Sequence, residues 1–131
     1  MVLGEFLLSS TLATILFDSG ASHSFISSSF VEKHNIPTVL LKTPLLTRTP
    51  GGDIKCQLGC LWVRINLSGV EFLADLVVLK SKGIDVILGM DWLSRHNGFI
   101  GCTDKVVHLT NPEGVRVTYH TRRKWTRPNG F

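Results

Sequence analysis

The chain has 131 residues, of which 44% are hydrophobic and 18% charged, which is typical of one folded domain and excludes a disordered chain. Its formal net charge of +4 comes from Arg122, Arg123, Lys124 and Arg127, because residues 1–118 hold ten basic and ten acidic residues. A neutral body argues against a nucleic-acid-binding face on the fold. We expect residues 119–131 to form a solvated basic tail or linker, with contact to RNA or another acidic partner as the alternative.

The three cysteines, Cys56, Cys60 and Cys102, are an odd number in a chain without a secretion signal. This favours free thiols in a reducing compartment, so we expect a cytoplasmic protein. No histidine or second cysteine pair completes a zinc site, and we expect neither a metal nor another cofactor. No run of about eighteen uncharged apolar residues is present, so no membrane span is expected.

Short apolar runs separated by turn residues begin the chain. Glu5–Ser10 and Thr11–Phe17 are predicted to be a strand pair that leads into Asp18. Ser27–Asn35 is predicted to be a short helix, with serine hydroxyls available to cap its first turn and Pro37 beyond its end.

The middle of the chain contains a predicted hairpin. Leu45–Thr49 and Ile54–Cys60 flank Pro50-Gly51-Gly52-Asp53, in which Pro-Gly fits the centre of a tight turn. Leu61–Leu67 alternates between apolar and other residues and is predicted to be a separate, half-buried strand. Phe72–Leu79 is more uniformly apolar and is predicted to be buried on both faces.

The last third continues the pattern. Asp85–Gly89 is predicted to be a short buried strand, followed by a helix over Met90–His96 that Asn97-Gly98 ends. Three final strands are predicted at Phe99–Cys102, Val106–Thr110 and Val115–Tyr119. Many short strands with one or two short helices predict an all-β domain over residues 1–118, a small barrel or sandwich, with Trp62 and Trp92 in its core.

Asp18 carries the most informative chemistry. It follows Ile15-Leu16-Phe17 directly and precedes Ser19-Gly20, so it is expected at the junction between a buried strand and a loop. Asp-Ser-Gly also occurs in ordinary β-turns, and by itself it is weak evidence for a catalytic site.

Three segments together resemble the retropepsins, and most closely the protease domain of gypsy-class LTR-retrotransposon polyproteins. They are Ala13–Ser27 around Asp-Ser-Gly, the hairpin at Pro50-Gly51-Gly52, and Asp85–Leu93 with its Ile-Leu-Gly. The resemblance extends from about Gly4 to about Tyr119. It implies an acid-protease barrel with a flap hairpin.

The resemblance also implies roles for individual residues. Asp18 matches the catalytic aspartate, within an active-site loop that continues through Ser19, Gly20 and Ala21. Ser19 matches a hydroxyl that ties two such loops together across a dimer. Substrate-binding positions are Ser22, Gly51 and Gly52, and structural support beneath the loop comes from Ile87, Leu88 and Gly89. Ser22 is a departure, since retroviral enzymes have an aspartate there.

The expected function is therefore aspartic-type endopeptidase activity in retrotransposon polyprotein processing. The mechanism needs two carboxylates and the chain has one Asp-Ser-Gly, so a homodimer is expected to act on a peptide or polyprotein substrate. The alternative is a catalytically inactive dimerisation or interaction module. Among other candidates, Asp91 is expected to stabilise a helix start, and His23 to be a structural or rim residue.

Overall fold

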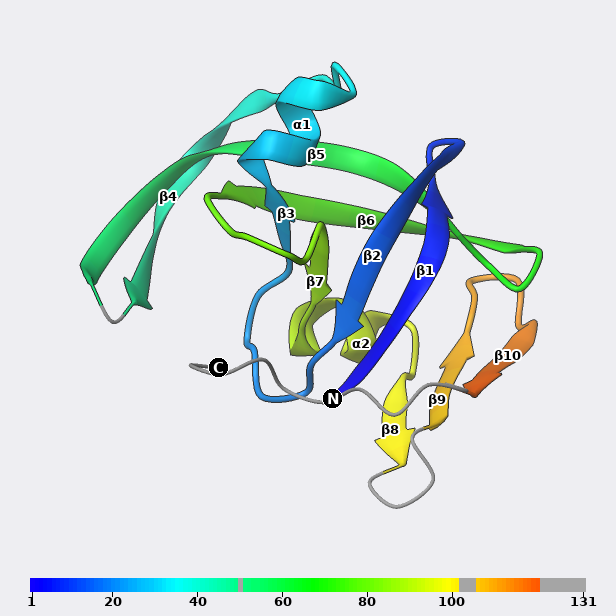
Figure 1. Cartoon of the computed structure of the whole chain (residues 1–131). Helices are drawn as coiled ribbons and strands as arrows, with labels where there is room; N and C mark the ends of the chain where they lie inside the picture. The colour runs from blue at the N-terminus through cyan, green and yellow to red at the C-terminus, as the bar shows by residue number, and fades with distance from the viewer. Residues whose placement is uncertain (50, 102–105, 121–131) are drawn as a thin grey trace.

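Ten strands and two short helices make up the described part of the chain, residues 1–49, 51–101 and 106–120 of this computed structural model (Figure 1). The strands are β1 (Val2–Leu8), β2 (Thr11–Phe17), β3 (Phe25–Ser27), β4 (Val39–Thr49), β5 (Gly52–Leu67), β6 (Val70–Leu79), β7 (Val86–Leu88), β8 (Phe99–Gly101), β9 (Val106–Thr110) and β10 (Arg116–His120). The helices are α1 (Ser28–Lys33) and α2 (Met90–Arg95). The all-β class with short helices is confirmed. Predictions for Pro50, Cys102 and the basic tail lie outside the described residues.

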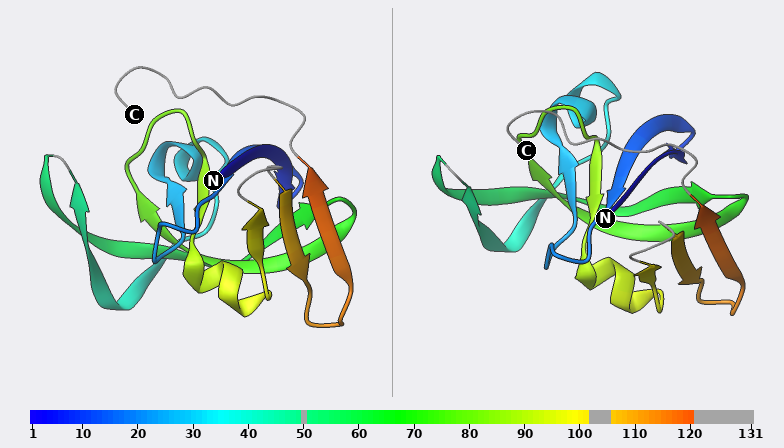
Figure 2. Two further views of the ribbon diagram at one scale, coloured as in Figure 1. Left: turned by 90° about the horizontal axis from the view of Figure 1, so that it is seen from below. Right: turned by 60° about the horizontal axis from the view of Figure 1, so that its bottom comes forward.

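A seven-stranded sheet closes into a barrel. Its order is β1-β2-β7-β3-β6-β5-β4, and β1 pairs with β5 as well as with β2. This second pairing joins the sheet to itself, while β4 continues outward from β5 as one arm of a projecting hairpin (Figures 1 and 2). A smaller sheet, β10-β9-β8, lies beside α2. No helix in the described ranges is long and apolar enough to span a membrane.

Strand β7 lies between β2 and β3 and positions the loop that connects them. It pairs in parallel with β2, with Phe17 opposite Leu88, and antiparallel with β3, with Ile26 opposite Val86. Residues 18–24 must therefore cross the carboxyl end of β7. This crossing brings the Asp18 segment against the residues that follow Leu88.

Aromatic side chains dominate the core under this crossing. Phe72 and Trp92 meet edge to face at 5.8 Å between ring centroids, and Phe17 lies 6.2 Å from Trp92. All three side chains are buried. Burial of each large apolar side chain contributes about 1.5–3 kcal/mol, so α2 is packed firmly beneath β2 and β6. The predicted core position of Trp92 is confirmed.

The predicted core position of Trp62 is wrong, because its side chain is 75% exposed. The separate strand predicted at Leu61–Leu67 is also wrong, since this segment is the second half of β5, after an irregularity between Cys60 and Val63. That bulge reverses the alternation, so Leu61 is exposed as well. Beyond it, buried and exposed residues alternate as predicted.

Strand β6 was predicted to be buried on both faces, and this is wrong. Phe72, Ala74 and Leu76 are buried, whereas Leu73 and Asp75 between them are exposed. The Asp75 carboxylate accepts a hydrogen bond from the Trp62 backbone N–H at 2.9 Å. One face of β6 therefore packs on the core while the other faces solvent.

Turn and helix ends differ from the predictions at two places. Ser9 and Ser10 form the β1–β2 turn with φ of 48° and 71°, instead of ending a strand. Ser27 precedes α1 without a side-chain capping bond, because its hydroxyl pairs with Ser29 Oγ at 2.7 Å. The predicted end of α2 agrees with the structure: Asn97 has φ of 49°, and Gly98 N–H donates to Leu93 O at 2.6 Å.

Candidate active site

The Asp18 loop is fixed to the barrel through its backbone. Asp18 N–H donates to Leu88 O at 2.9 Å, and Ala21 N–H donates back to Asp18 O at 3.2 Å. The Ala21 carbonyl in turn accepts a hydrogen bond from Met90 N–H at 2.7 Å. These bonds join the loop to β7 and to the start of α2. The structure thus brings together Asp18, Ala21 and Leu88.

The Asp18 carboxylate is half-buried and held at one oxygen. Its Oδ1 accepts a hydrogen bond from Gly20 N–H at 2.9 Å, and Oδ2 has no hydrogen bond to any residue the structure describes. A Cβ added at Gly20 would lie 3.2 Å from that Oδ1. Gly20 therefore lets the backbone turn close to the carboxylate, which keeps one oxygen oriented and the other available to a water or a substrate.

Gly89, directly after β7, lies close to the backbone of the Asp18 loop. A Cβ at this position would collide with the His23 carbonyl oxygen and lie 2.6 Å from the Ala21 carbonyl oxygen. Both neighbours are backbone atoms, which cannot move aside as a flexible side chain can. Glycine is consequently required here for the loop to cross β7.

Ser24 connects the same elements through its side chain, a role that the sequence analysis did not identify. It is 1% exposed, and its Oγ accepts a hydrogen bond from Gly89 N–H at 3.0 Å. The same Oγ donates to Asp91 Oδ1 at 2.6 Å, and Asp91 Oδ1 also accepts from Trp92 N–H at 2.7 Å. Asp91 therefore supports the first turn of α2, as predicted, and anchors the loop as well.

Ser19, Ser22 and His23 are exposed on the loop. Ser22 Oγ and His23 Nδ1 lie 3.2 Å apart, and this pair does not include the Asp18 carboxylate. The arrangement gives no support to a Ser/His/Asp triad. Ser19 has no side-chain hydrogen bond within the described residues, so its hydroxyl is available to another molecule.

Gly51 and Gly52 lie at the far end of the β4–β5 hairpin, which projects from the barrel (Figures 1 and 2). Thr49 pairs with Gly52, which has φ of 120° and open space around its Cβ position. Leu40, Leu46 and Ile54 on the two arms are exposed. The hairpin and the Asp18 loop remain separate in the single chain.

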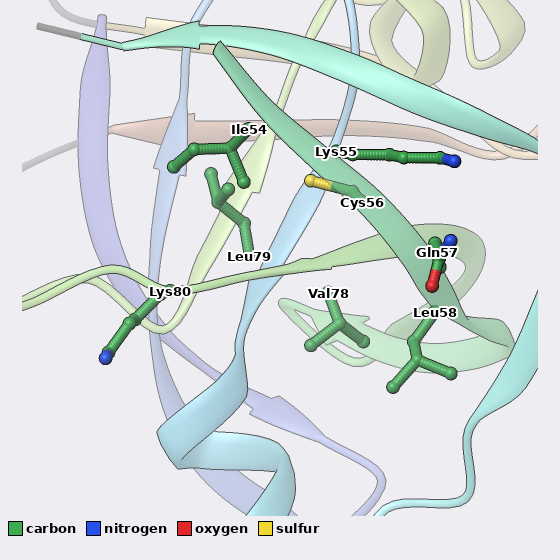
Figure 3. Close-up of a pocket in the computed structure, with 8 residues that line it drawn as sticks. All are labelled: Ile54, Lys55, Cys56, Gln57, Leu58, Val78, Leu79 and Lys80. Atoms are coloured by element: carbon green, nitrogen blue, oxygen red, sulfur yellow. The ribbon is translucent and has the colours of Figure 1, made fainter. Parts of the chain in front are cut away.

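A hollow of about 260 Å³ lies between the second arm of this hairpin and the end of β6 (Figure 3). Ile54, Leu58 and Leu79 supply apolar side chains, while Lys55 and Lys80 extend to opposite sides in that view. Asp18 does not border the hollow.

No group of three or more histidine, cysteine, aspartate or glutamate residues in the described ranges is placed to hold a metal. Cys56 and Cys60 are buried free thiols, and burial raises the pKa of Cys60. A protonated, buried thiol is a poor ligand and a poor nucleophile. The arrangement around Asp18 can supply an acid or a base, oriented by backbone groups.

The comparisons with known proteins agree with this geometry. The retroviral aspartyl protease family model matches residues 1–115, and the chain belongs to this family. The retroviral protease-like domain of Ddi1 from Leishmania major is similar in structure, with a TM-score of 0.64 and 19% sequence identity over 85% of this chain and 89% of that chain. The EIAV protease complexed with the inhibitor HBY-793 has a TM-score of 0.53 and 20% identity over 71% of this chain and 85% of that one. No curated protein sequence matches the chain.

Proposed function

We propose that the protein is an aspartic endopeptidase that acts as a homodimer, with Asp18 of each subunit as the catalytic carboxylate. The proposal rests on the hydrogen bonding of the Asp18 carboxylate. One carboxylate oxygen accepts a hydrogen bond from Gly20 N–H at 2.9 Å, and the other has no hydrogen bond within the described residues. The loop that carries Asp18 packs closely against the end of β7 because Gly89 has no side chain. Membership of the retroviral aspartyl protease family supports the same chemistry.

The mechanism requires two carboxylates with one proton between them. One, ionised, takes a proton from a water that attacks the peptide carbonyl carbon, while the other donates its proton to the carbonyl oxygen. The chain has one Asp-Ser-Gly sequence. A two-fold dimer supplies the second carboxylate from an identical loop, and the exposed Ser19 hydroxyl is free to bond across the axis.

We assign the substrate as a polypeptide bound between the Asp18 loop and the β4–β5 hairpin. The exposed Leu46 and Ile54 give the hairpin apolar contacts for substrate side chains, and Gly51-Gly52 lets its tip move. Processing of a gypsy-class retrotransposon polyprotein is the setting we propose. The alternative is an inactive interaction module, since structural similarity to the Ddi1 domain at 19% identity indicates the fold alone.

The test is cleavage of a mixed peptide library at mildly acidic pH over a range of enzyme concentrations. We expect initial rates to rise faster than linearly with enzyme, because only dimers contain a complete site. Asp18→Asn should abolish cleavage and leave the fold unchanged by circular dichroism. Glu32→Gln, which removes an exposed carboxylate from α1, is the matched control and should keep full activity.

Residual cleavage by Asp18→Asn well above background would overturn the assignment of this carboxylate. Initial rates strictly proportional to enzyme concentration, from a protein that sedimentation shows to be monomeric, would overturn the dimer. Absence of cleavage by a protein shown by sedimentation to be folded and dimeric would favour the inactive interaction module instead.

A further inference from the structure

A second groove lies near the β5–β6 turn. Figure 1 shows this turn at the opposite end of the molecule from the tip of the β4–β5 hairpin. The groove has a volume of about 690 Å³ and lies between the solvent face of the β5–β6 hairpin, the end of α2 and the turn over residues 111–115. Asp18, Gly51 and Gly52 do not border it. It is therefore separate from the candidate active site.

Trp62 borders this groove in a strained backbone conformation. Its φ is 55°, a left-handed value that costs a non-glycine residue about 1–2 kcal/mol. The bulge between Cys60 and Val63 and the bond from Trp62 N–H to Asp75 Oδ1 hold it there. The result is an indole that is 75% exposed. Bulges commonly redirect a side chain near a functional site.

Two more apolar side chains are exposed in the same groove. Leu73 is 47% exposed and Val115 is 44% exposed, and they come from different elements. Single exposed apolar residues are ordinary on a protein surface, but several gathered in one concave site indicate a binding surface. Tryptophan is also, with tyrosine and arginine, enriched among the residues that dominate the binding energy of an interface.

The charge of the groove defines what it can bind. Glu71, Asp75 and Glu113 line it together with a single cation, Arg95, and none of these four side chains forms an ion pair with another described residue. Arg64 lies beyond Trp62 in a smaller hollow that shares only Trp62 and Glu71 with the groove. Two copies joined groove to groove would bring like charges together, which disfavours self-association through this face.

We infer that this groove binds a basic peptide segment of another protein. An apolar side chain of the segment packs against Trp62, Leu73 and Val115, and lysine or arginine residues on either side approach Glu71 and Glu113. The volume suits a short stretch of polypeptide. Because the groove contains no part of the Asp18 loop, it holds this partner without cleaving it.

The experiment measures binding of three labelled peptides to the full chain by fluorescence anisotropy. The probes are GRKFRKG, the acidic peptide GEDFEDG, and GRKSRKG, which keeps the charge and lacks the aromatic ring. Amide chemical shifts then locate the binding site. The measurement is repeated with Asp18→Asn, so that occupation of the candidate active site is recognised as a difference between the two proteins.

We expect GRKFRKG to bind more tightly than either other peptide and to shift amide signals in residues 70–75 and 111–115. Trp62→Asn should weaken binding roughly tenfold or more, because asparagine tolerates the left-handed conformation but lacks the ring. Glu113→Lys should weaken it as well and lower its dependence on salt. The matched controls are Phe99→Asn and Glu32→Lys, which change an exposed ring and an exposed acid elsewhere.

Equal affinity of GRKFRKG for the unchanged chain, Trp62→Asn and Glu113→Lys would overturn the inference. So would tighter binding of the acidic peptide, shifts confined to the β4–β5 hairpin, or no binding at millimolar peptide. If Trp62→Asn proves unfolded by circular dichroism, Glu113→Lys, at an exposed turn position, decides the question alone.

Discussion

The Asp18 loop and the β4–β5 hairpin contribute to the same proposed site, yet they are held in opposite ways. Residues 18–24 are joined to β7 and α2 by bonds across the chain, including Ser24 to Asp91 over 67 residues of sequence. In the described sheets, β4 pairs with β5 alone. Several hydrogen bonds to β7 and α2 therefore fix the conformation of the loop, whereas the projecting hairpin is held mainly by the pairing of β4 with β5.

This difference matches two separate tasks in the proposed site, which are to position the carboxylate and to cover the bound polypeptide. A catalytic carboxylate needs a fixed orientation, which buried bonds and a close glycine contact supply. A cover over a polypeptide must open and close, which favours elements with few buried contacts. Substitutions in the loop should therefore lower stability and activity together, while substitutions in the hairpin should lower activity alone.

The largest effect is expected from Gly89→Ala. The new methyl group would collide with the carbonyl oxygens of Ala21 and His23, and we expect a loss of about 3 kcal/mol in the free energy of unfolding. Urea denaturation measures this loss. Gly69→Ala is the control, because its φ is 85° with open space around it, and it should cost about 1 kcal/mol. Equal effects of the two substitutions would show that the loop contact is unimportant.

Ser24→Ala should have the next largest effect. It leaves the Gly89 N–H without its acceptor in a buried place and removes a donor from Asp91, at a cost of about 2 kcal/mol. The catalytic rate should fall with it, because the loop loses an anchor. Ser22→Ala removes an exposed hydroxyl from the same loop and should change stability little. A fully stable Ser24→Ala would contradict the anchoring role.

His96, which directly follows α2 and packs against Phe72 and Trp92, should make the stability depend on pH. Burial lowers the pKa of His96 below its ordinary 6.5; the hydrogen bond to Leu73 O opposes this shift and the charge of Arg95 adds to it. The unfolded chain therefore takes up this proton at a higher pH than the folded chain. Stability is full above about pH 6.5 and decreases as the pH falls below it.

Thermal unfolding between pH 7.5 and 5 measures this dependence. His96→Phe keeps an aromatic ring against Phe72 and Trp92, and it should flatten the decrease. His120→Asn, an exposed histidine at the end of β10, should retain it. A decrease of the same size in His96→Phe would assign the effect to other groups.

The smallest change in stability is expected from Leu46→Ser in the hairpin. This side chain is 70% exposed, so the free energy of unfolding should change by less than about 0.5 kcal/mol. Because the proposed substrate contact would lose an apolar side chain, kcat/KM should fall by up to about tenfold. Leu12→Ser, exposed on β2, is the control and should leave kcat/KM unchanged. A large loss of stability in Leu46→Ser would show that hairpin substitutions, like loop substitutions, lower the stability of the fold.

The sequence predicted those features that local patterns encode. Alternation, turn residues and glycines located both helices and nearly all the strands, and Asp18 at the end of a buried strand was expected from the apolar residues before it. Trp62 was expected in the core as a large apolar side chain, although the alternation over Leu61–Leu67 places it on the exposed face with Arg64 and Asn66. Leu61 departs from this alternation because a bulge, at which Asp75 of the neighbouring strand accepts a hydrogen bond, changes the face it occupies. The register between two strands is not visible in either strand alone.

Ser24 was missed for a related reason. Its partners are Gly89 and Asp91, and the 65 and 67 residues that separate them from it place this contact beyond any local pattern. A serine between His23 and Phe25 has no distinguishing feature in the sequence. The resemblance to retropepsins identified the loop and its supporting strand, but the side-chain bonds that connect them required the three-dimensional structure.

The parallel pairing of β2 with β7 has a consequence for biosynthesis. Phe17 lies opposite Leu88, so the strand that orients Asp18 leaves the ribosome 71 residues after the strand it pairs with. Contacts this distant in sequence form slowly and late. A nascent or truncated chain that ends before residue 85 lacks the Leu88 carbonyl and Gly89 altogether. Its Asp18 would lack the backbone contacts that orient it, so under the proposed function a partly synthesised copy would not cleave the polypeptides around it.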